Sequence, residues 1–316
     1  MTQTPPARRM RLGIAPALEE GGMKGKTPRF KDIQAMAQAA ERAGFDSLWL
    51  EDHLLFRFPN QPEQGCWEGF TFLSAVAAVT TRIALGSFVA ATSFRNPALL
   101  AKMAESLDEI SDGRFILGLG AGWHEPEYTA FGYLFDHRAA RFEEALQIIV
   151  PLLREGQVDF AGQYYSAREC VLRPRGPSQG QLPIWIGASK PRMLRLVARY
   201  ANAWNTVWHR QPQGVRDVMP EFLAACQEVG RDPASIELTA GSFAEIVLPG
   251  EQRKPDAKGI GGQAEEVAAG LRGFADVGVR HLVLLVEPED ITGIERFARV
   301  IELLDEMEAS AGQQPG

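Results

Sequence analysis

ESLDEISDGRFILGLGAGWHEPEYTAFG, residues 105–132, is the stretch of sequence that decides the fold. It begins with the end of a predicted helix, passes through a Ser-Asp-Gly turn at 111–113 and enters a short apolar strand at 115–119. Three glycines alternate along the end of that strand: Gly118, Gly120 and Gly122. Because glycine carries no side chain, either a cofactor or a neighbouring segment can pack closely against this backbone.

The glycine pattern is not the dinucleotide-binding fingerprint. That motif requires a third glycine, which opens a helix, and an acidic residue about 20 residues further on. Here Trp123 occupies the third-glycine position, and Pro126, which disfavours a helix, follows closely. The loop therefore does not predict a dinucleotide site.

The same helix, turn and strand unit repeats in both directions from this stretch. We predict apolar strands at 11–15, 47–51, 83–89, 115–119, 184–188, 203–207, 236–248 and 281–286. Helices are predicted between and after them, at 31–43, 70–80, 97–110, 138–154, 191–200, 215–229, 264–277 and 291–309. The strands are continuous apolar runs, which is typical of parallel strands buried on both faces.

Eight alternating β/α units predict an α/β fold, a (β/α)8 TIM barrel formed as a single domain by residues 1–316. An insertion at 157–182 contains two hairpin-like apolar runs, and we expect it to cover one face. The rival is a doubly wound sheet. Its phosphate loop usually follows the first strand, where RLGIAPALEE at 11–20 offers none.

Composition excludes several classes of partner. The net charge of −7 argues against nucleic acid and anionic membranes, which both favour a basic surface. No apolar run is long enough for a signal sequence or a membrane span. The three cysteines lack CxxC or Cys/His spacing, so we expect free thiols and a cytoplasmic protein.

Active sites of such barrels form at the carboxyl ends of the strands. This rule selects Asp52, His53, residues 87–89, 120–123 and 187–190, Asn205 and Thr206. The set has almost no carboxylate pairs and no His/Cys/Asp cluster, which argues against a two-carboxylate hydrolase and against a metal site. Its small residues suit a planar ring with a phosphate or ribityl tail.

His53 is the best acid–base candidate because it ends a buried strand beside a carboxylate. Asp52 could hold the tautomer of His53 or raise its pKa. The alternative is a core histidine bonded to a loop carbonyl, and that reading is preferred for the four other histidines: His124, His137, His209 and His281.

Two loops compete as the seat of a phosphate. The turn at 187–191 joins a strand to a helix start and has Lys190 and Arg192 nearby. The loop at 250–262, with Arg253, Lys254 and Lys258, precedes a later helix. The cations of the second loop are equally consistent with a solvated loop.

Several segments resemble the luciferase-like monooxygenase family, whose members are (β/α)8 barrels that bind reduced flavin or the deazaflavin coenzyme F420. They are FDSLWLEDH (45–53), TTRIALGSFV (80–89), FRNPALLAKMAESLDEISDGRFILGLGAGW (94–123), RFEEALQII (141–149) and LPIWIGASKPRMLRLVARYANAWN (182–205). Within the family, GAGW and LRLVARYA-AWN are most similar to the F420-dependent oxidoreductase branch.

The resemblance implies a role for each loop. Asp52 and His53 would face the cofactor ring, with His53 as the acid–base group. Three further segments would contact the cofactor: Ser87, Phe88 and Val89, where the family often has a non-proline cis peptide that supports the ring; Gly120, Ala121, Gly122 and Trp123, beside the ring edge; and Gly187, Ala188 and Ser189, at the phosphate.

The implied activity is hydride transfer between F420 and an organic substrate. An FMNH2-dependent monooxygenase of the luciferase or alkanesulfonate monooxygenase type, which uses O2 and a partner reductase, is the alternative, and a non-catalytic cofactor-binding barrel is a third. The sugar-phosphate dehydrogenases of the family carry a glutamate where Trp123 stands. Trp123 is therefore expected to shape an apolar substrate pocket with Phe56, Phe58 and Trp67, in what we expect to be a homodimer.

Overall fold

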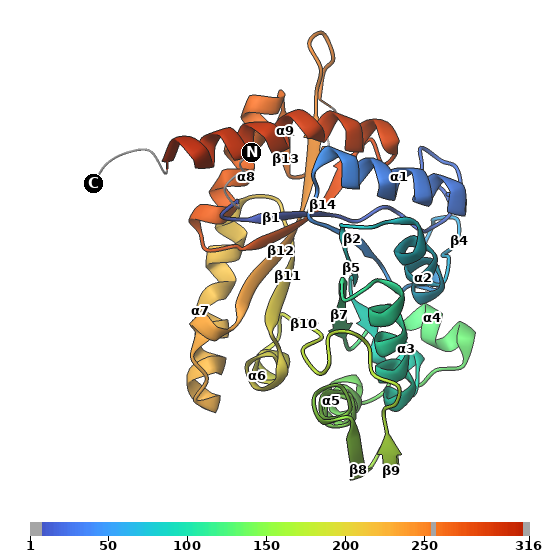
Figure 1. Ribbon diagram of the computed structural model, residues 1–316. Coiled ribbons are helices and arrows are strands. Elements are labelled where there is room, and N and C mark those ends of the chain that lie inside the picture. The colour runs from blue at the N-terminus through green and yellow to red at the C-terminus, as the bar shows by residue number, and fades with distance from the viewer. Residues whose placement is uncertain (1–7, 254–256, 312–316) are drawn as a thin grey trace.

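A computed structural model describes residues 8–253 and 257–311 as a closed barrel of parallel strands (Figure 1). The barrel strands are β1 (Arg11–Ile14), β2 (Ser47–Leu50), β5 (Ala84–Ser87), β7 (Phe115–Gly120), β10 (Ile184–Gly187), β11 (Ala203–His209), β12 (Glu237–Ile246) and β14 (His281–Glu287). They pair in chain order, and pairing of β14 with β1 closes the cylinder.

A helix follows each barrel strand and packs on its outer face (Figure 1). These helices are α1 (Phe30–Ala43), α2 (Gly69–Val79), α3 (Pro97–Ile110), α5 (Arg138–Glu155), α6 (Pro191–Tyr200), α7 (Pro212–Val229), α8 (Ala264–Asp276) and α9 (Ile291–Ala311). The predicted (β/α)8 barrel is confirmed, and it forms a single domain.

Several short elements flank the barrel strands. β3 (Leu55–Phe56) pairs with β4 (Gln64–Gly65), β6 (Ala90–Ala91) pairs in parallel with the end of β7, and β13 (Ile260–Gly262) pairs in parallel with the end of β12. The 3-10 turn η1 (Thr92–Phe94) and helix α4 (Glu125–Phe131) follow β6 and β7, and η2 (Pro233–Ser235) precedes β12.

Two hydrophobic layers hold the barrel together. The larger one lies between strands and helices, and a small second cluster containing Trp49, Ile116 and Trp185 fills the lumen. The rings of Trp49 and Trp185 meet across the lumen at 4.3 Å between centroids. Successive side chains on a strand alternate in direction, so Ser47 and Trp49 of β2 point inward while Leu48 and Leu50 point to the helices.

A hairpin of β8 (Gln157–Ala161) and β9 (Ser166–Val171) lies between α5 and β10 in the sequence and projects at the bottom of Figure 1. Its turn folds back on α5, because the backbone N–H groups of Tyr164 and Tyr165 donate to Glu144 at 2.8 and 3.0 Å. Arg141 of the same helix lies over the ring of Tyr164.

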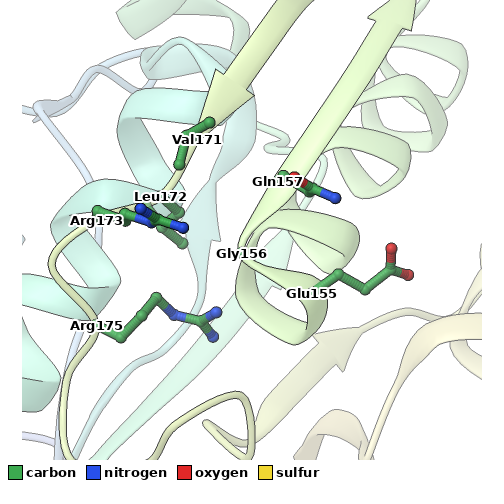
Figure 2. A pocket seen from close by; sticks show the side chains of 7 residues that line it. All are labelled: Glu155, Gly156, Gln157, Val171, Leu172, Arg173 and Arg175. Carbon is green, nitrogen blue, oxygen red and sulfur yellow. The ribbon is translucent and has the colours of Figure 1, made fainter.

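A cavity of about 340 Å³ lies at the base of this hairpin, between the end of α5 and the end of β9 (Figure 2). Figure 2 shows Arg173 and Arg175 on one side of it and Gly156 on the other. Helix α5 runs back from the carboxyl end of β7, so its last residue lies at the amino ends of the strands. Since barrel enzymes place their chemistry at the other end, this cavity is not the active-site candidate.

None of the helices in residues 8–253 and 257–311 is long and apolar enough to cross a membrane. The three cysteines, Cys66, Cys170 and Cys226, are all free.

Candidate active site

The loops named from the sequence converge at one end of the barrel, because all eight strands run parallel and their carboxyl ends meet there. Val89, just after β5, joins three of these loops. A side-chain carbon at Gly120 would lie 2.6 Å from a Val89 methyl group, and one at Gly187 would lie 3.2 Å from it. The ends of β5, β7 and β10 are therefore in direct contact.

The floor of this mouth is apolar and aromatic. The Phe88–Val89 peptide bond is cis, as the resemblance implies. The ring of Phe88 lies 5.7 Å from Trp49 and 5.5 Å from Trp208, which in turn lies 5.2 Å from Phe243. Ser87 is buried below them, where its hydroxyl donates to the carbonyl of Gly118 at 2.8 Å.

The glycine-rich loop after β7 is held by side chains from two helices. At Gly118 and Gly120 the space of a side chain is filled by the Ser87 carbonyl and by Val89, so these two glycines serve packing. The hydroxyl of Tyr128 donates to the carbonyl of Ala121 at 3.1 Å, and Arg138 donates to that of Gly122 at 2.6 Å. The loop therefore has a fixed course past the mouth.

Asp52 does not orient His53, contrary to the expectation from their adjacency. Its side chain points out of the barrel and forms a two-pronged ion pair with Arg95, at 2.7 and 2.8 Å, and accepts the N–H of Ala91 at 3.0 Å. Burial raises the pKa of Asp52, and the Arg95 guanidinium limits that rise. Consecutive residues of an extended segment point in opposite directions, which is why the pair separates.

The partner of His53 is Glu127 of α4. Nδ1 of His53 lies 3.0 Å from a Glu127 carboxylate oxygen, and the other oxygen accepts the N–H of Leu54 at 2.9 Å. The Glu127 side chain is almost wholly buried, whereas His53 remains partly exposed to the mouth. A carboxylate on Nδ1 fixes the ring and leaves Nε2 facing outward, which is the arrangement of an acid–base histidine.

An aromatic wall rises beside His53. It comprises Phe56 and Phe58 from the loop after β2, and Trp123 and His124 from the loop after β7. The ring of Trp123 lies 5.5 Å from His53 and 6.3 Å from Phe58, and Trp123 is 56% exposed, so it presents a face to the mouth.

His124 is a buried histidine hydrogen-bonded to the backbone, in line with the structural reading, whereas Trp67 differs from its sequence-based expectation. The Arg57 N–H donates to Nε2 of His124 at 3.0 Å and burial lowers the pKa of His124, so the ring is a neutral part of the wall. Trp67, which was expected in the pocket, instead stacks on Phe72 and donates to the carbonyl of Pro28 at 2.7 Å. His281 also lies in the barrel, where it contacts Ser47 in the lumen at 2.6 Å.

The turn of Gly187, Ala188 and Ser189 lies between β10 and α6. The indole N–H of Trp204 donates to the carbonyl of Ala188 at 2.9 Å, and the side chain of Lys190, the N-cap residue of α6, makes no capping hydrogen bond. In the competing loop, Arg253 is bound to Glu245 and to two backbone carbonyls, and α8 has its own capping box. Lys254 of that loop lies outside the described residues.

The mouth holds more carboxylates than the sequence led us to expect. Glu51, the residue after β2, lies close enough to Glu19, Glu127 and Glu289 for their charges to act on its carboxyl group. Burial, followed by the charge of Glu19, raises the pKa of Glu51 well above its ordinary value. Sequence reasoning missed these residues because they come from separate loops that only the closed barrel brings together.

Two comparisons with curated proteins cover most of the chain. Pyrimidine monooxygenase RutA of Agrobacterium fabrum is 30% identical over 313 residues, which is 90% of this chain and 82% of that protein. Phthiodiolone/phenolphthiodiolone dimycocerosates ketoreductase of Mycobacterium tuberculosis is 31% identical over 245 residues, or 72% of this chain and 63% of that protein.

Two solved structures share the fold at low sequence identity. An F420-dependent secondary alcohol dehydrogenase, in complex with an F420–acetone adduct, superimposes with a TM-score of 0.78 at 20% identity, over 94% of this chain and 99% of that one. Monooxygenase RslO1 of Streptomyces bottropensis gives 0.74 at 21%, over 96% and 100%. The family model for luciferase-like monooxygenases matches residues 10–254, and the chain belongs to this family of enzymes.

Proposed function

We propose that this enzyme transfers a hydride between coenzyme F420 and the carbonyl group of an organic substrate. The observation that carries the proposal is the His53–Glu127 pair, at 3.0 Å, which faces an aromatic-walled mouth. Carbonyl reduction needs a hydride donor together with groups that bind the substrate oxygen and handle its proton, and the pair supplies a hydrogen bond to that oxygen.

The residues of the mouth fit a flat ring. Phe88 and Val89 form an apolar floor, and the neighbouring Gly120 and Gly187 have no room for side chains that would rise above it. Val207 and Trp208 at the end of β11 are each more than 40% exposed, although they belong to a barrel strand. Exposed apolar surface in a concave site is what a planar cofactor covers.

The phosphate of the cofactor would lie at the turn of Gly187, Ala188 and Ser189. The N-cap residue of α6, Lys190, makes no capping hydrogen bond, so backbone N–H groups at this helix start can bind an anion. Arg253 in the competing loop is committed to Glu245. The segment Gly120, Ala121, Gly122 and Trp123 would border the ring, with Asp52 behind it holding Arg95.

In the reaction that we propose, bound F420 supplies or accepts the hydride. Nε2 of His53 handles hydrogen bonding at the substrate oxygen, while Glu127 keeps the ring oriented through Nδ1. Trp123, Phe56 and Phe58 enclose the apolar part of the substrate and exclude water from the reacting atoms. The relative that is a ketoreductase by name supports a carbonyl substrate.

A reduced-flavin monooxygenase that uses O2 and a partner reductase is the second candidate. It is favoured by the match to a pyrimidine monooxygenase along 90% of the chain. The same ring seat would then hold FMN. For either cofactor, we also propose that the protein is a cytoplasmic homodimer that acts on a small organic molecule. Light scattering on the purified protein would test the dimer.

The deciding experiment compares two assays on one preparation. Under anaerobic conditions, reduced F420 should be oxidised when ketones with an apolar side chain are added, and His53→Ala should bind the cofactor yet turn over about 100-fold more slowly. Oxygen uptake with reduced FMN that rises above the uptake by reduced FMN alone when an organic substrate is added, with no reaction with F420, would instead establish the monooxygenase. Tight binding without any turnover dependent on His53 would indicate a non-catalytic barrel.

A further inference from the structure

Glu51 lies at the end of β2 and points into the barrel mouth. Ser47 and Trp49 face the lumen, where the Trp49 indole donates to Ser47 at 2.6 Å, and Glu51 has the same parity along the extended chain. Glu51 therefore belongs to the inward-facing set of β2 residues that includes Trp49, and it precedes His53 by two residues.

Three other glutamates lie close to Glu51. Glu19 approaches from the loop after β1, Glu127 from α4 and Glu289 from the loop after β14. The Cys66 thiol, beside β4, is close enough for the Glu51 charge to contribute to raising its pKa. Carboxylates that are close together in a buried place cannot all ionise without a large electrostatic cost, so such a group retains a proton.

One oxygen of Glu51 provides a second, independent observation. Oε1 is buried and has no hydrogen-bond donor among the described residues. A buried polar atom without a partner is costly in a folded protein, and such atoms are found where a ligand or a proton completes the site.

We propose that Glu51 shares a proton with Glu19 and is the proton donor to the substrate oxygen. The inference rests on the proposed function, since it assigns the donor for carbonyl reduction. It also separates two roles, because His53 then positions the oxygen through a hydrogen bond while Glu51 gives up the proton.

The step balances in atoms and electrons. The carbonyl carbon gains a hydride from the reduced deazaflavin, the π pair of the C=O bond moves to oxygen, and that oxygen takes the proton of Glu51 to give an alcohol. The deazaflavin is oxidised by two electrons and the carbonyl carbon is reduced by two. The Glu51–Glu19 pair regains one proton from water before the next turnover.

The first test uses the protein without cofactor. Infrared spectroscopy at neutral pH should show a protonated carboxyl in the wild type that Glu51→Gln removes. The matched control is Glu105→Gln, which alters another buried glutamate, paired with Arg175 at 2.9 Å, and should leave the band in place. Glu19→Gln should shift the titration of the band to lower pH, because a like charge is lost. This second variant tests the assignment of the band if Glu51→Gln does not fold.

The second test uses the F420-loaded enzyme. The rate of ketone reduction should fall at high pH as Glu51 loses its proton, and Glu51→Gln should be about 100-fold slower with that limb absent. His53→Gln should keep the limb at a lower rate. A wild type without the carboxyl band, or a Glu51→Gln variant with unchanged rate and limb, overturns the inference. A wild type that shows the band but no turnover with F420 refutes the proposed function, and with it the donor role.

Discussion

Glu127 orients the imidazole ring of His53 for its role in the proposed reaction. Its carboxylate is buried against the N–H of Leu54 and Nδ1 of His53, so it is held in one geometry by two donors. Hydrogen bonds to a buried carboxylate are stronger than hydrogen bonds to an exposed one, because water does not compete for the buried oxygens. The orientation of the imidazole follows from that fixed acceptor.

Replacing Glu127 by Gln should therefore lower kcat/KM by about 10- to 100-fold, since the charged acceptor that orients the imidazole through Nδ1 is removed. Glu125, two residues earlier in the first turn of α4, is exposed and provides the matched control in Glu125→Gln. Steady-state kinetics on both variants measure the effect. Equal rates for the two variants would contradict the role of Glu127.

Glu51 gives a prediction about stability. Because its pKa in the folded state is raised, the folded protein binds more protons than the unfolded chain, and stability falls as pH rises from about 4.3 through the raised value. Glu51→Gln removes that loss and should make the cofactor-free protein more stable at neutral pH. Urea unfolding of both proteins across this pH range measures it, and a variant that is less stable at every pH would show the prediction to be wrong.

Adjacency in the sequence predicts position well and partnership poorly. His53 was identified because a strand ends there, and the structure places it at the mouth. Its assumed partner Asp52 pairs with Arg95, and its actual partner lies 74 residues away. A pairing across that separation depends on how α4 docks, which no local pattern encodes.

Among the elements, strand β7 depends on its glycines to pack against β5. A methyl group at Gly118 would overlap the carbonyl oxygen of Ser87, which belongs to the neighbouring strand. The glycines of the strand thus permit β5 and β7 to approach, and the same contact supports the Phe88–Val89 floor.

Gly118→Ala should destabilise the fold by about 1–3 kcal/mol, the usual cost of overpacking a core that cannot move. Gly65→Ala is the control, because a methyl group there meets nothing closer than 3.4 Å. Chemical denaturation gives both values. A Gly118→Ala variant as stable as the control would mean that the strands separate easily.

The periodicity of apolar residues predicted the long helices and strands correctly. The presence of a proline led to a wrong prediction for the short helix α4. Helix α6 has the same ends as predicted, and the other barrel helices and strands agree to within a few residues. Pro126 was read as disfavouring a helix, yet it lies in the first turn of α4. Proline is tolerated there because the first backbone N–H groups of a helix have no partner within it.

On the scale of the whole molecule, the candidate catalytic residues and the stabilising ion pairs lie at opposite ends of the barrel. The carboxyl ends of the strands carry His53, Glu51 and the aromatic wall, whereas the opposite end carries buried ion pairs such as Glu105 with Arg175. Alternation of strands and helices predicted this division before any contact was known. The identity of the cofactor depends on side-chain detail within the mouth, which alternation does not determine.

The most direct test of the account is a calorimetric titration of the cofactor-free protein with F420 and with FMN, side by side. F420 should bind with micromolar or tighter affinity and more tightly than FMN, and replacing Gly187 with Val should weaken its binding, since the new side chain enters the space beside Val89. Absence of binding by either cofactor would contradict the claim that this mouth seats a flat redox ring.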